Sequence, residues 1–263
     1  MSKAPKVSVV TSVYNGEKYI EECVQSILNQ SFEDFEFILL DNGSTDGTAE
    51  LLDRIKDSRV RVIHQENLGI PQSLNKGIHL ARGELIARLD ADDVSYPHRL
   101  EHQIKFMDAN KDYVLCGGGY KRLINGSLSP QTVPLPFTDH DIRRSLSRFN
   151  PIAHSAVIFR KEAFLQVGGY DQHLLFTQDY DLWIRLMKIG KACNLEKNLG
   201  FVRFYDASTW SRNKRITFFE TLKVKWKAYS LYGGSLLYLI YFFLRGLLVL
   251  TVRNYFEPKK NPD

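Results

Sequence analysis

Residues 7–16 are Val-Ser-Val-Val-Thr-Ser-Val-Tyr-Asn-Gly, a β-branched apolar run that ends in a turn signal. The apolar part, Val7–Val13, predicts a buried strand. The segment that follows, Glu17–Asn29, repeats apolar side chains at helical spacing and predicts a helix. A buried strand followed directly by a helix is the basic unit of an α/β fold.

The alternation of strands and helices continues to residue 89. Further strands are predicted at 35–40, 60–64 and 84–89, with helices from about 45 to 56 and over 71–81 between them. This order predicts a parallel sheet with helices on both faces. Ligands of such sheets bind beyond the carboxyl ends of the strands, so the polar residues at those ends form the candidate site.

The pattern is less regular after residue 93. A helix is predicted over Pro97–Ala109 and a hairpin-type turn at Asn125-Gly126. Residues 127–140 contain three prolines and are expected to form a loop. The remaining predicted elements are strands at 113–117, 152–159 and 199–204 and a helix at 179–189.

The composition is that of a globular protein. The 263 residues are 44% hydrophobic and 25% charged, which excludes disordered, collagen-like and coiled-coil classes. The net charge of +5 is unevenly distributed, because residues 201–263 hold eleven Lys/Arg and four Asp/Glu (+7) and residues 1–200 carry −2. Since the larger part is slightly acidic, nucleic acid is not expected as a partner.

Cysteine usage and the N-terminus favour the cytoplasm. Cys23, Cys116 and Cys193 lie far apart and form no C-x-x-C pair, which favours a reducing compartment over a disulfide framework. The run Val7–Val13 is too short for the core of a signal peptide and lacks a small-residue cleavage site. We therefore expect the main body to stay in the cytoplasm.

Three acidic residues, Asp90, Asp92 and Asp93, follow the predicted strand at 84–89. In an extended chain, Asp90 and Asp92 point the same way and can face one ligand. Paired carboxylates suit Mg²⁺ or Mn²⁺, with the remaining ligands supplied by substrate phosphates. The alternative is a solvated acidic turn before the helix at Pro97, which is the commoner occurrence for this triplet taken alone.

Two other strand-end residues are candidates for nucleotide contacts. Asp41 ends the second strand and could accept a hydrogen bond from a base or a ribose, or it could simply close the Asp-Asn-Gly-Ser turn. Tyr14 ends the first strand and could stack on a base or stand as an aromatic residue at the rim.

The acids of Thr177-Gln-Asp-Tyr-Asp-Leu-Trp183 open a predicted helix. Asp179 could be a general base that takes a proton from an acceptor hydroxyl. Asp179 or Asp181 could instead be a first-turn or N-cap acid that the helix dipole stabilises. Taken alone, this stretch favours the capping interpretation.

These motifs occur together and in order, and they carry a family resemblance. The matching stretches are 7–16, Asp41-Asn-Gly-Ser-Thr-Asp-Gly47, Glu66-Asn-Leu-Gly-Ile70, Ala81-Arg-Gly-Glu84, Ala87-Arg-Leu-Asp-Ala-Asp-Asp93 with Pro97 and Arg99-Leu100, and Gln178-Asp-Tyr-Asp-Leu-Trp-Ile-Arg185. On them, residues 6 to about 211 resemble the family 2 glycosyltransferases, of the bacterial surface-polysaccharide type. The resemblance implies an inverting enzyme of the GT-A fold: a Rossmann-like α/β fold with a mixed, mainly parallel sheet flanked by helices.

The resemblance also implies a role for each candidate residue. The nucleoside pocket is assigned to four residues: Ser12, Val13, Tyr14 and Asp41. Asp92 is the expected ligand of Mn²⁺ or Mg²⁺, and Asp90 the ribose contact or a residue behind the metal. Asp179 is the expected catalytic base, so that an acceptor hydroxyl displaces the nucleoside diphosphate in a single step.

The chain departs from the family pattern at two places. Asn42 replaces a second aspartate that many members have, and Tyr205 stands where a late Tyr-Arg-x-His pattern has histidine. Arg203 of that pattern is present and is a candidate phosphate contact. His154 is a candidate on the acceptor side, although a strand histidine without a visible partner is more often structural.

The C-terminal residues 212–263 are predicted to be a helical tail that associates with a membrane. Residues 212–227 are basic, and an apolar stripe recurs at helical spacing: Ile216, Phe219, Leu222, Trp226 and Tyr229. Such a helix suits an anionic lipid surface or, equally, a position packed on the body. The hydrophobic segment Ser235–Val252 contains Arg245, and both of its flanks are basic. These features favour a monotopic or shallow anchor over a single membrane span.

The sequence therefore predicts a catalytic domain at 1–211 and an anchoring tail at 212–263. The expected reaction moves a sugar from a nucleotide sugar, with UDP favoured, to a lipid-linked glycan at the cytoplasmic face of the plasma membrane. The alternatives are a sugar nucleotidyltransferase, although no Gly-rich phosphate loop follows the first strand, and a membrane-docked scaffold without activity.

Overall fold

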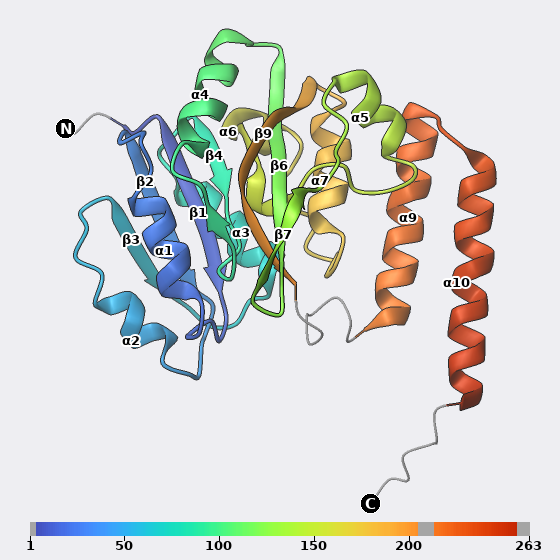
Figure 1. Ribbon diagram of the computed structural model, residues 1–263, viewed down its shortest axis with the longest axis horizontal. Helices are drawn as coiled ribbons and strands as arrows, with labels where there is room; N and C mark the ends of the chain where they lie inside the picture. Colours follow the sequence, from blue (N-terminus) through green and yellow to red (C-terminus); the bar gives the residue numbers. More distant parts are fainter. Residues whose placement is uncertain (1–3, 205–212, 257–263) are drawn as a thin grey trace, which may run out of the picture.

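The computed structural model describes residues 4–204 and 213–256. Its strands are β1 (Val7–Val13), β2 (Phe35–Asp41), β3 (Val60–His64), β4 (Leu85–Arg88), β5 (Val94–Ser95), β6 (Tyr113–Ile124), β7 (Ser127–Thr132), β8 (Ile158–Arg160) and β9 (Lys191–Phe204). The helices are α1 (Ile20–Leu28), α2 (Thr48–Asp53), α3 (Ile70–Leu80), α4 (Arg99–Ala109), α5 (Asp139–Ser145), α6 (Lys161–Gln166), α7 (Gln178–Leu186), α9 (Lys214–Tyr232) and α10 (Leu236–Phe256). One sheet joins all the strands, in the order β3-β2-β1-β4-β8-β6-β9-β5, with β7 paired to β6 (Figure 1).

The sheet is parallel in its first half and mixed in its second. The strands β1, β2, β3 and β4 pair in parallel, whereas β8 runs antiparallel to both β4 and β6. The register sets Val13 beside Asp41, and Asp41 beside His64. The carboxyl ends of three neighbouring strands therefore lie along one edge of the sheet, as the alternating pattern predicts.

Two apolar layers cover the faces of the sheet. Val9 and Phe37 point to the layer that contains α1 and α4, and Val10 and Ile38 point to the layer that contains α3 and α7. The alternation along β1 and β2 follows from the two-residue period of a strand. Because both faces are covered, every residue of β2 is buried.

The predictions are confirmed for the first half of the chain and are wrong in parts of the second. Residues 127–132 were expected in a loop but form β7, which continues β6 through the hairpin turn at Asn125-Gly126. The short strand β7 is polar and largely exposed, so the sequence carries no apolar alternation to reveal it.

The predicted strand at 152–159 is also wrong in extent. Residues His154–Ala156 form a turn of 3-10 helix, and the strand β8 covers only Ile158–Arg160. The turn directs Ser155 toward Asp90, where its hydroxyl donates a hydrogen bond. Residues 154–156 thus form a turn that bonds Asp90, in place of the extended conformation that the apolar pattern predicts.

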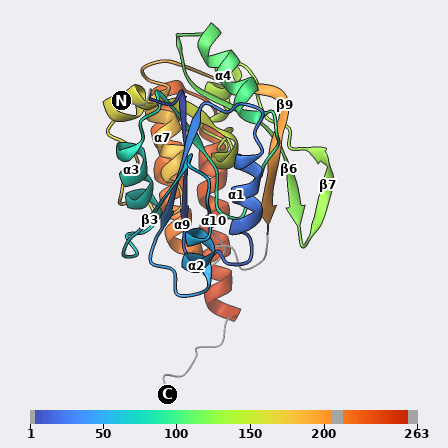
Figure 2. The same ribbon diagram turned by 90° about the vertical axis from the view of Figure 1, so that its left-hand side faces the viewer.

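The C-terminal helices α9 and α10 run side by side beyond α7 (Figures 1 and 2). The helix α9 packs against the body through a face that includes Thr217, Val224 and Ala228. Most of the predicted apolar stripe points away from that face, since Ile216, Phe219 and Trp226 are all exposed. Among the residues described, no helix combines the length and hydropathy needed to cross a membrane.

Candidate functional site

Asp41 is a buried anion at the end of β2. One carboxylate oxygen accepts a hydrogen bond from the Ser44 backbone N–H at 3.0 Å, and the other lies 2.8 Å from His64 Nδ1. Burial by itself raises the pKa of Asp41, but these hydrogen bonds outweigh it and lower the pKa below its usual range. In return, Asp41 raises the pKa of His64.

The turn after Asp41 depends on a glycine. Gly43 has a φ of +78°, and a Cβ there would lie 2.9 Å from the backbone nitrogen of Asn67. The bond from Ser44 to Asp41 closes this turn, so the turn-closing interpretation of Asp41 describes what the residue does here. The predicted contact with a base is a separate role and stays a prediction.

The loop after β1 is tied to the same turn. Asn15 has a left-handed φ of 54°, donates from its backbone to Ser44 Oγ and accepts from the Thr45 backbone. This geometry leaves the Tyr14 side chain 52% exposed, while Val13 is buried and Ser12 is partly buried. The structure thus brings the predicted nucleoside residues 12–14 and Asp41 to adjacent strand ends.

Asp90 is held by two side chains. One carboxylate oxygen contacts the guanidinium of Arg88, and the other accepts a 2.8 Å hydrogen bond from Ser155 Oγ. Burial raises the pKa of Asp90, but the charge of Arg88 and these hydrogen bonds outweigh it and hold the pKa at about 2. Asp90 is therefore an anion at any physiological pH.

Asp92 and Asp93 lie next to the C-terminal end of β9, where both contact Arg203. The buried carboxylate of Asp93 accepts from the Arg203 backbone N–H at 2.7 Å, and burial together with the charges of Asp92 and Asp90 raises its pKa well above the usual range. The Arg203 guanidinium donates to the Asp92 carbonyl at 2.8 Å and pairs with Glu22 at 2.7 Å. Arg203, a predicted phosphate contact, thus holds the acidic loop in place. Tyr205 lies outside the described residues.

Asp179 lies in the first turn of α7 with both carboxylate oxygens bonded. One accepts from the Tyr180 backbone N–H at 2.7 Å and the other from Asn150 Nδ2 at 2.8 Å. Burial raises the pKa of Asp179 to about 6, and the negative charge of Asp90 adds to the effect. A carboxylate with a pKa near 6 is ionised at neutral pH and basic enough to accept a proton.

Asp181, two residues further along α7, has a different environment. It is buried and forms ion pairs with Arg185 at 2.7 Å and with Lys227 at 2.6 Å. Asp181 therefore joins α7 to α9, whereas Asp179 borders a cavity of about 400 Å³. The structure assigns the two acids of one motif to different tasks, packing for Asp181 and the cavity for Asp179.

His154 lies behind Asp90 and is nearly buried. Its Nε2 accepts from Arg88 Nε at 3.2 Å and lies 2.8 Å from the Tyr170 hydroxyl. Burial and the charge of Arg88 lower the pKa of His154 to about 3, so the ring is neutral. The predicted contact of His154 with phosphate or acceptor stays a prediction.

The loop that carries Asp90, Asp92 and Asp93 fits a divalent metal only if a substrate supplies further ligands. Within residues 4–204 and 213–256, no group of three or more His, Cys, Asp or Glu side chains is arranged to hold a metal ion. Asp90 and Asp92 offer hard oxygen donors, and Asp90 already bonds two protein groups. This donor set suits Mg²⁺ or Mn²⁺ that takes the rest of its ligands from a diphosphate and water.

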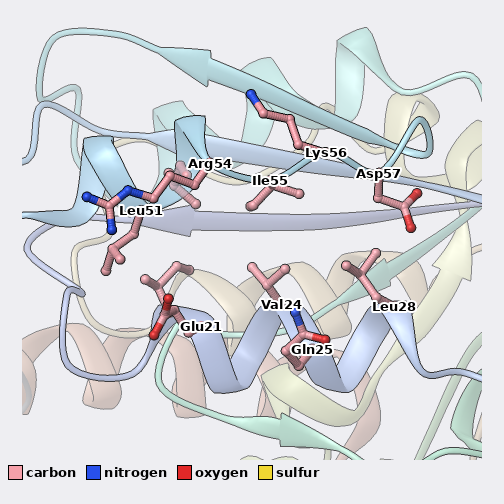
Figure 3. Close-up of a pocket in the computed structure, with 11 residues that line it drawn as sticks. Glu21, Val24, Gln25, Leu28, Leu51, Arg54, Ile55, Lys56 and Asp57 are labelled. Atoms are coloured by element: carbon pink, nitrogen blue, oxygen red, sulfur yellow. The ribbon is translucent and has the colours of Figure 1, made fainter.

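A second cavity, of about 460 Å³, opens between α1 and the segment that contains α2 (Figure 3). Glu21 and Gln25 line it from α1, and Arg54 and Asp57 line it from the other side. None of the strand-end acids and no residue of α7 borders this cavity. It is therefore separate from the candidate site.

Four partner residues of the site were not identified from the sequence: His64, Arg88, Asn150 and Ser155. His64 and Arg88 had a usable signal, since one ends a predicted strand and the other is a charge inside an apolar strand. Asn150 and Ser155 had none, because their positions depend on the irregular segment before β8.

Comparison with known sequences gives one consistent result. A family model described as glycosyl transferase family 2 matches residues 8–168. An uncharacterized glycosyltransferase of Methanocaldococcus jannaschii is 35% identical over 85% of this chain and 80% of its own. The putative glycosyltransferase EpsE of Bacillus subtilis is 32% identical, over 77% and 74%. The amylovoran biosynthesis glycosyltransferase AmsE of Erwinia amylovora is 31% identical, over 70% and 70%.

Solved structures share the fold at low sequence identity. TarS of S. aureus, residues 1–349 with UDP-GlcNAc, has a TM-score of 0.70 at 20% identity and covers 84% of this chain. The mannosyltransferase PcManGT of Pyrobaculum calidifontis, with GDP-Man and Mn²⁺, has a TM-score of 0.66 at 18% identity and covers 87%. This chain spans 65% and 64% of those two chains. The fold is therefore GT-A-like, with a mixed sheet.

Proposed function

Because the chain belongs to glycosyltransferase family 2, and is thus a transferase, we propose that it moves a sugar from a nucleoside diphosphate sugar to a hydroxyl with inversion. The observation that carries the proposal is the state of Asp179, a carboxylate that borders a cavity and whose pKa is raised to about 6. A general base needs this combination of access and basicity. A nucleotidyltransferase is disfavoured because no Gly-rich phosphate loop follows β1, and an inactive scaffold would need no such base.

In the proposed reaction, Asp179 takes the proton of the acceptor hydroxyl. The hydroxyl oxygen then forms a bond to the anomeric carbon while the bond from that carbon to the diphosphate breaks. The nucleoside diphosphate leaves with the bonding electron pair, and the anomeric configuration inverts. The bonds from Asn150 and from the Tyr180 N–H fix the orientation of the carboxylate during this step.

We assign the donor to the strand ends of β1, β2 and β4. The residues Ser12, Val13, Tyr14 and Asp41 would hold the nucleoside, and Asp92 with Asp90 would hold Mn²⁺ or Mg²⁺ against the diphosphate. When bound, the metal would offset the negative charge of the leaving diphosphate. UDP is the favoured nucleotide, since TarS was solved with UDP-GlcNAc, and the manganese in the PcManGT complex supports a divalent ion.

The acceptor of this proposal is a lipid-linked glycan of a surface polysaccharide. The name of AmsE refers to the biosynthesis of amylovoran, and this relative covers 70% of the chain. The exposed apolar side chains of α9 and α10 support a lipid surface: Ile216, Phe219, Trp226, Leu237, Ile240, Tyr241, Leu244 and Leu248. With the charge of +7 after residue 200, these side chains support contact with the cytoplasmic surface of the plasma membrane in a monotopic arrangement.

Replacing the base tests the reaction. Asp179→Asn should lower the transfer rate by about 10²–10⁴-fold, since general base catalysis contributes that much. Binding of UDP with Mn²⁺ should stay unchanged, because Asp179 is not one of the residues assigned to the nucleotide or the metal. Asp171→Asn, in the segment before α7, is the matched control and should leave the rate unchanged. A normal rate in Asp179→Asn would remove Asp179 as the base.

The membrane contact is tested on the full-length chain. Phe219→Ser combined with Trp226→Ser should reduce flotation with vesicles of phosphatidylcholine and phosphatidylglycerol by at least about tenfold, because two large apolar side chains no longer enter the lipid. Leu165→Ser, at an equally exposed position on α6, is the control and should float like the wild type. Equal flotation of all three proteins would contradict the proposed surface.

A further inference from the structure

The C-terminal helices form one wall of the cavity that Asp179 borders. Asp179 and Asn150 line the cavity from the body, Thr221 and Lys225 line it from α9, and Phe242 lines it from α10. Residues of the two C-terminal helices therefore border the same space as the candidate base. The tail is thus part of the cavity as well as a candidate membrane contact.

Lys225 is an unusual component of this wall. It is only 4% exposed, and its ammonium donates one hydrogen bond to the Arg148 carbonyl. The rings of Phe242 and Tyr238 lie beneath the same group, with centres 4.7 Å and 5.0 Å away. Among the side chains that the structure describes, no carboxylate forms an ion pair with Lys225, and burial lowers its pKa to about 8.

Glu220, a buried charged residue on the same helix, has hydrogen-bond partners for both of its carboxylate oxygens. The carboxylate of Glu220 accepts from the backbone N–H groups of Leu175 and Phe176, both at 2.9 Å, and from the Thr177 hydroxyl at 3.3 Å. Lys225 has three N–H donors, and within the part of the chain that the structure describes only one oxygen accepts from them. A buried cation with donors to spare, at the edge of a cavity, is a preformed site for an anion.

We propose that this cavity receives the acceptor and that Lys225 binds a phosphate group carried by it. The proposal rests on the proposed function, since it takes Asp179 as the base for the acceptor hydroxyl. A phosphate in the cavity could accept from the N–H groups of Lys225 that meet no oxygen acceptor among the described residues. The rings of Phe242 and Tyr238 offer a surface for a sugar or an alkyl chain. The phosphate belongs either to a sugar phosphate or to the headgroup of a lipid.

The test is a binding titration on the full chain with UDP and Mg²⁺ present to fill the strand-end site. The phosphate probes are glucose 1-phosphate, hexyl phosphate and inorganic phosphate, and the uncharged counterparts are methyl glucoside and hexanol. The variant Lys225→Met keeps the apolar stem and removes the charge, and Lys225→Arg keeps the charge. Lys223→Met is the matched control, because Lys223 is exposed on the same helix.

We expect the wild type to prefer an organic phosphate to its uncharged counterpart by about tenfold or more, as one charge-assisted hydrogen bond allows. Lys225→Met should lose the preference, while Lys225→Arg and Lys223→Met should keep most of it. Tighter binding of glucose 1-phosphate would identify a sugar phosphate as the source, and tighter binding of hexyl phosphate a lipid headgroup.

Three outcomes would overturn the proposal: no preference in the wild type, an unchanged preference in Lys225→Met, or binding of inorganic phosphate alone. Repeating the titration without UDP separates this proposal from the proposed function. If the protein binds no UDP, the proposed function is contradicted. The titration without UDP would still show whether Lys225 gives a preference for phosphate.

Discussion

The strand ends and the α7 cavity both contain charged groups that are partly or fully buried, and the surroundings of Asp41 and Asp90 act in the opposite way to those of Asp179 and Lys225. At the strand ends, Asp41 bonds His64 and Asp90 pairs with Arg88, and these partners help to lower both pKa values. Around the cavity, burial dominates: the pKa of Asp179 rises to about 6 and that of Lys225 falls to about 8. Asp41 and Asp90 are therefore fixed anions, although burial and its acidic neighbours raise the pKa of Asp93 beside them. The cavity holds groups poised to exchange a proton or gain a partner.

The largest expected effect on stability comes from removing a partner at the strand ends. Arg88→Met leaves the Asp90 carboxylate without its cation, and it also removes the hydrogen bond to the Val10 carbonyl at 2.9 Å. We expect the free energy of unfolding in urea to fall by about 2–4 kcal/mol, less than for a fully buried pair, because the Asp90 side chain is 38% exposed.

Lys111→Met is the control for this change, since its ion pair with Asp108 is exposed on both sides. It should cost less than about 0.5 kcal/mol. If Arg88→Met lowered the free energy of unfolding no more than this control, the ion pair of Arg88 with Asp90 would not stabilise the strand ends.

A smaller effect is expected from pH, and it reports on the cavity. Because the reacting form of Asp179 is the anion and its pKa is about 6, kcat/KM should fall about tenfold for each pH unit below 6. Asp90, with a pKa of about 2, adds no transition in this range. A profile that stays flat down to pH 4 would show that the burial of Asp179 does not govern its basicity.

Asn150→Ala makes the same measurement specific to Asp179. The variant removes a hydrogen bond that favours the anion, so the pKa of Asp179 should rise and the acidic limb should move to higher pH. A variant that lowers kcat/KM equally at every pH would indicate loss of structure in place of a shifted pKa.

The two regions also differ in how far the sequence predicts them. Asp41, Asp90 and Asp92 follow apolar strands, and the parallel register then brings them to one edge, so that part of the site is predictable. Lys225 is not, because in the sequence it belongs to a basic cluster that suits a surface. The structure buries Lys225 and exposes Trp226, its apolar neighbour, because α9 packs on α7 through its other face.

The same limit applies to Asn150. Its role depends on an irregular segment that no apolar period describes, and only the folded chain brings it to Asp179. Local pattern therefore identifies residues whose positions follow from regular elements. It misses those that a loop or a docked helix brings in.

The packing of α9 against the body affects which acceptor hydroxyl groups Asp179 can reach. Glu220 bonds the segment just before α7, Lys227 pairs with Asp181, and Tyr232 donates to the Ile184 carbonyl at 2.8 Å. These contacts join the helix that carries exposed apolar side chains rigidly to the helix that carries Asp179. On the proposed bilayer surface, Asp179 would therefore lie at a fixed height above the lipid. The enzyme would then select acceptor hydroxyl groups that lie at that height.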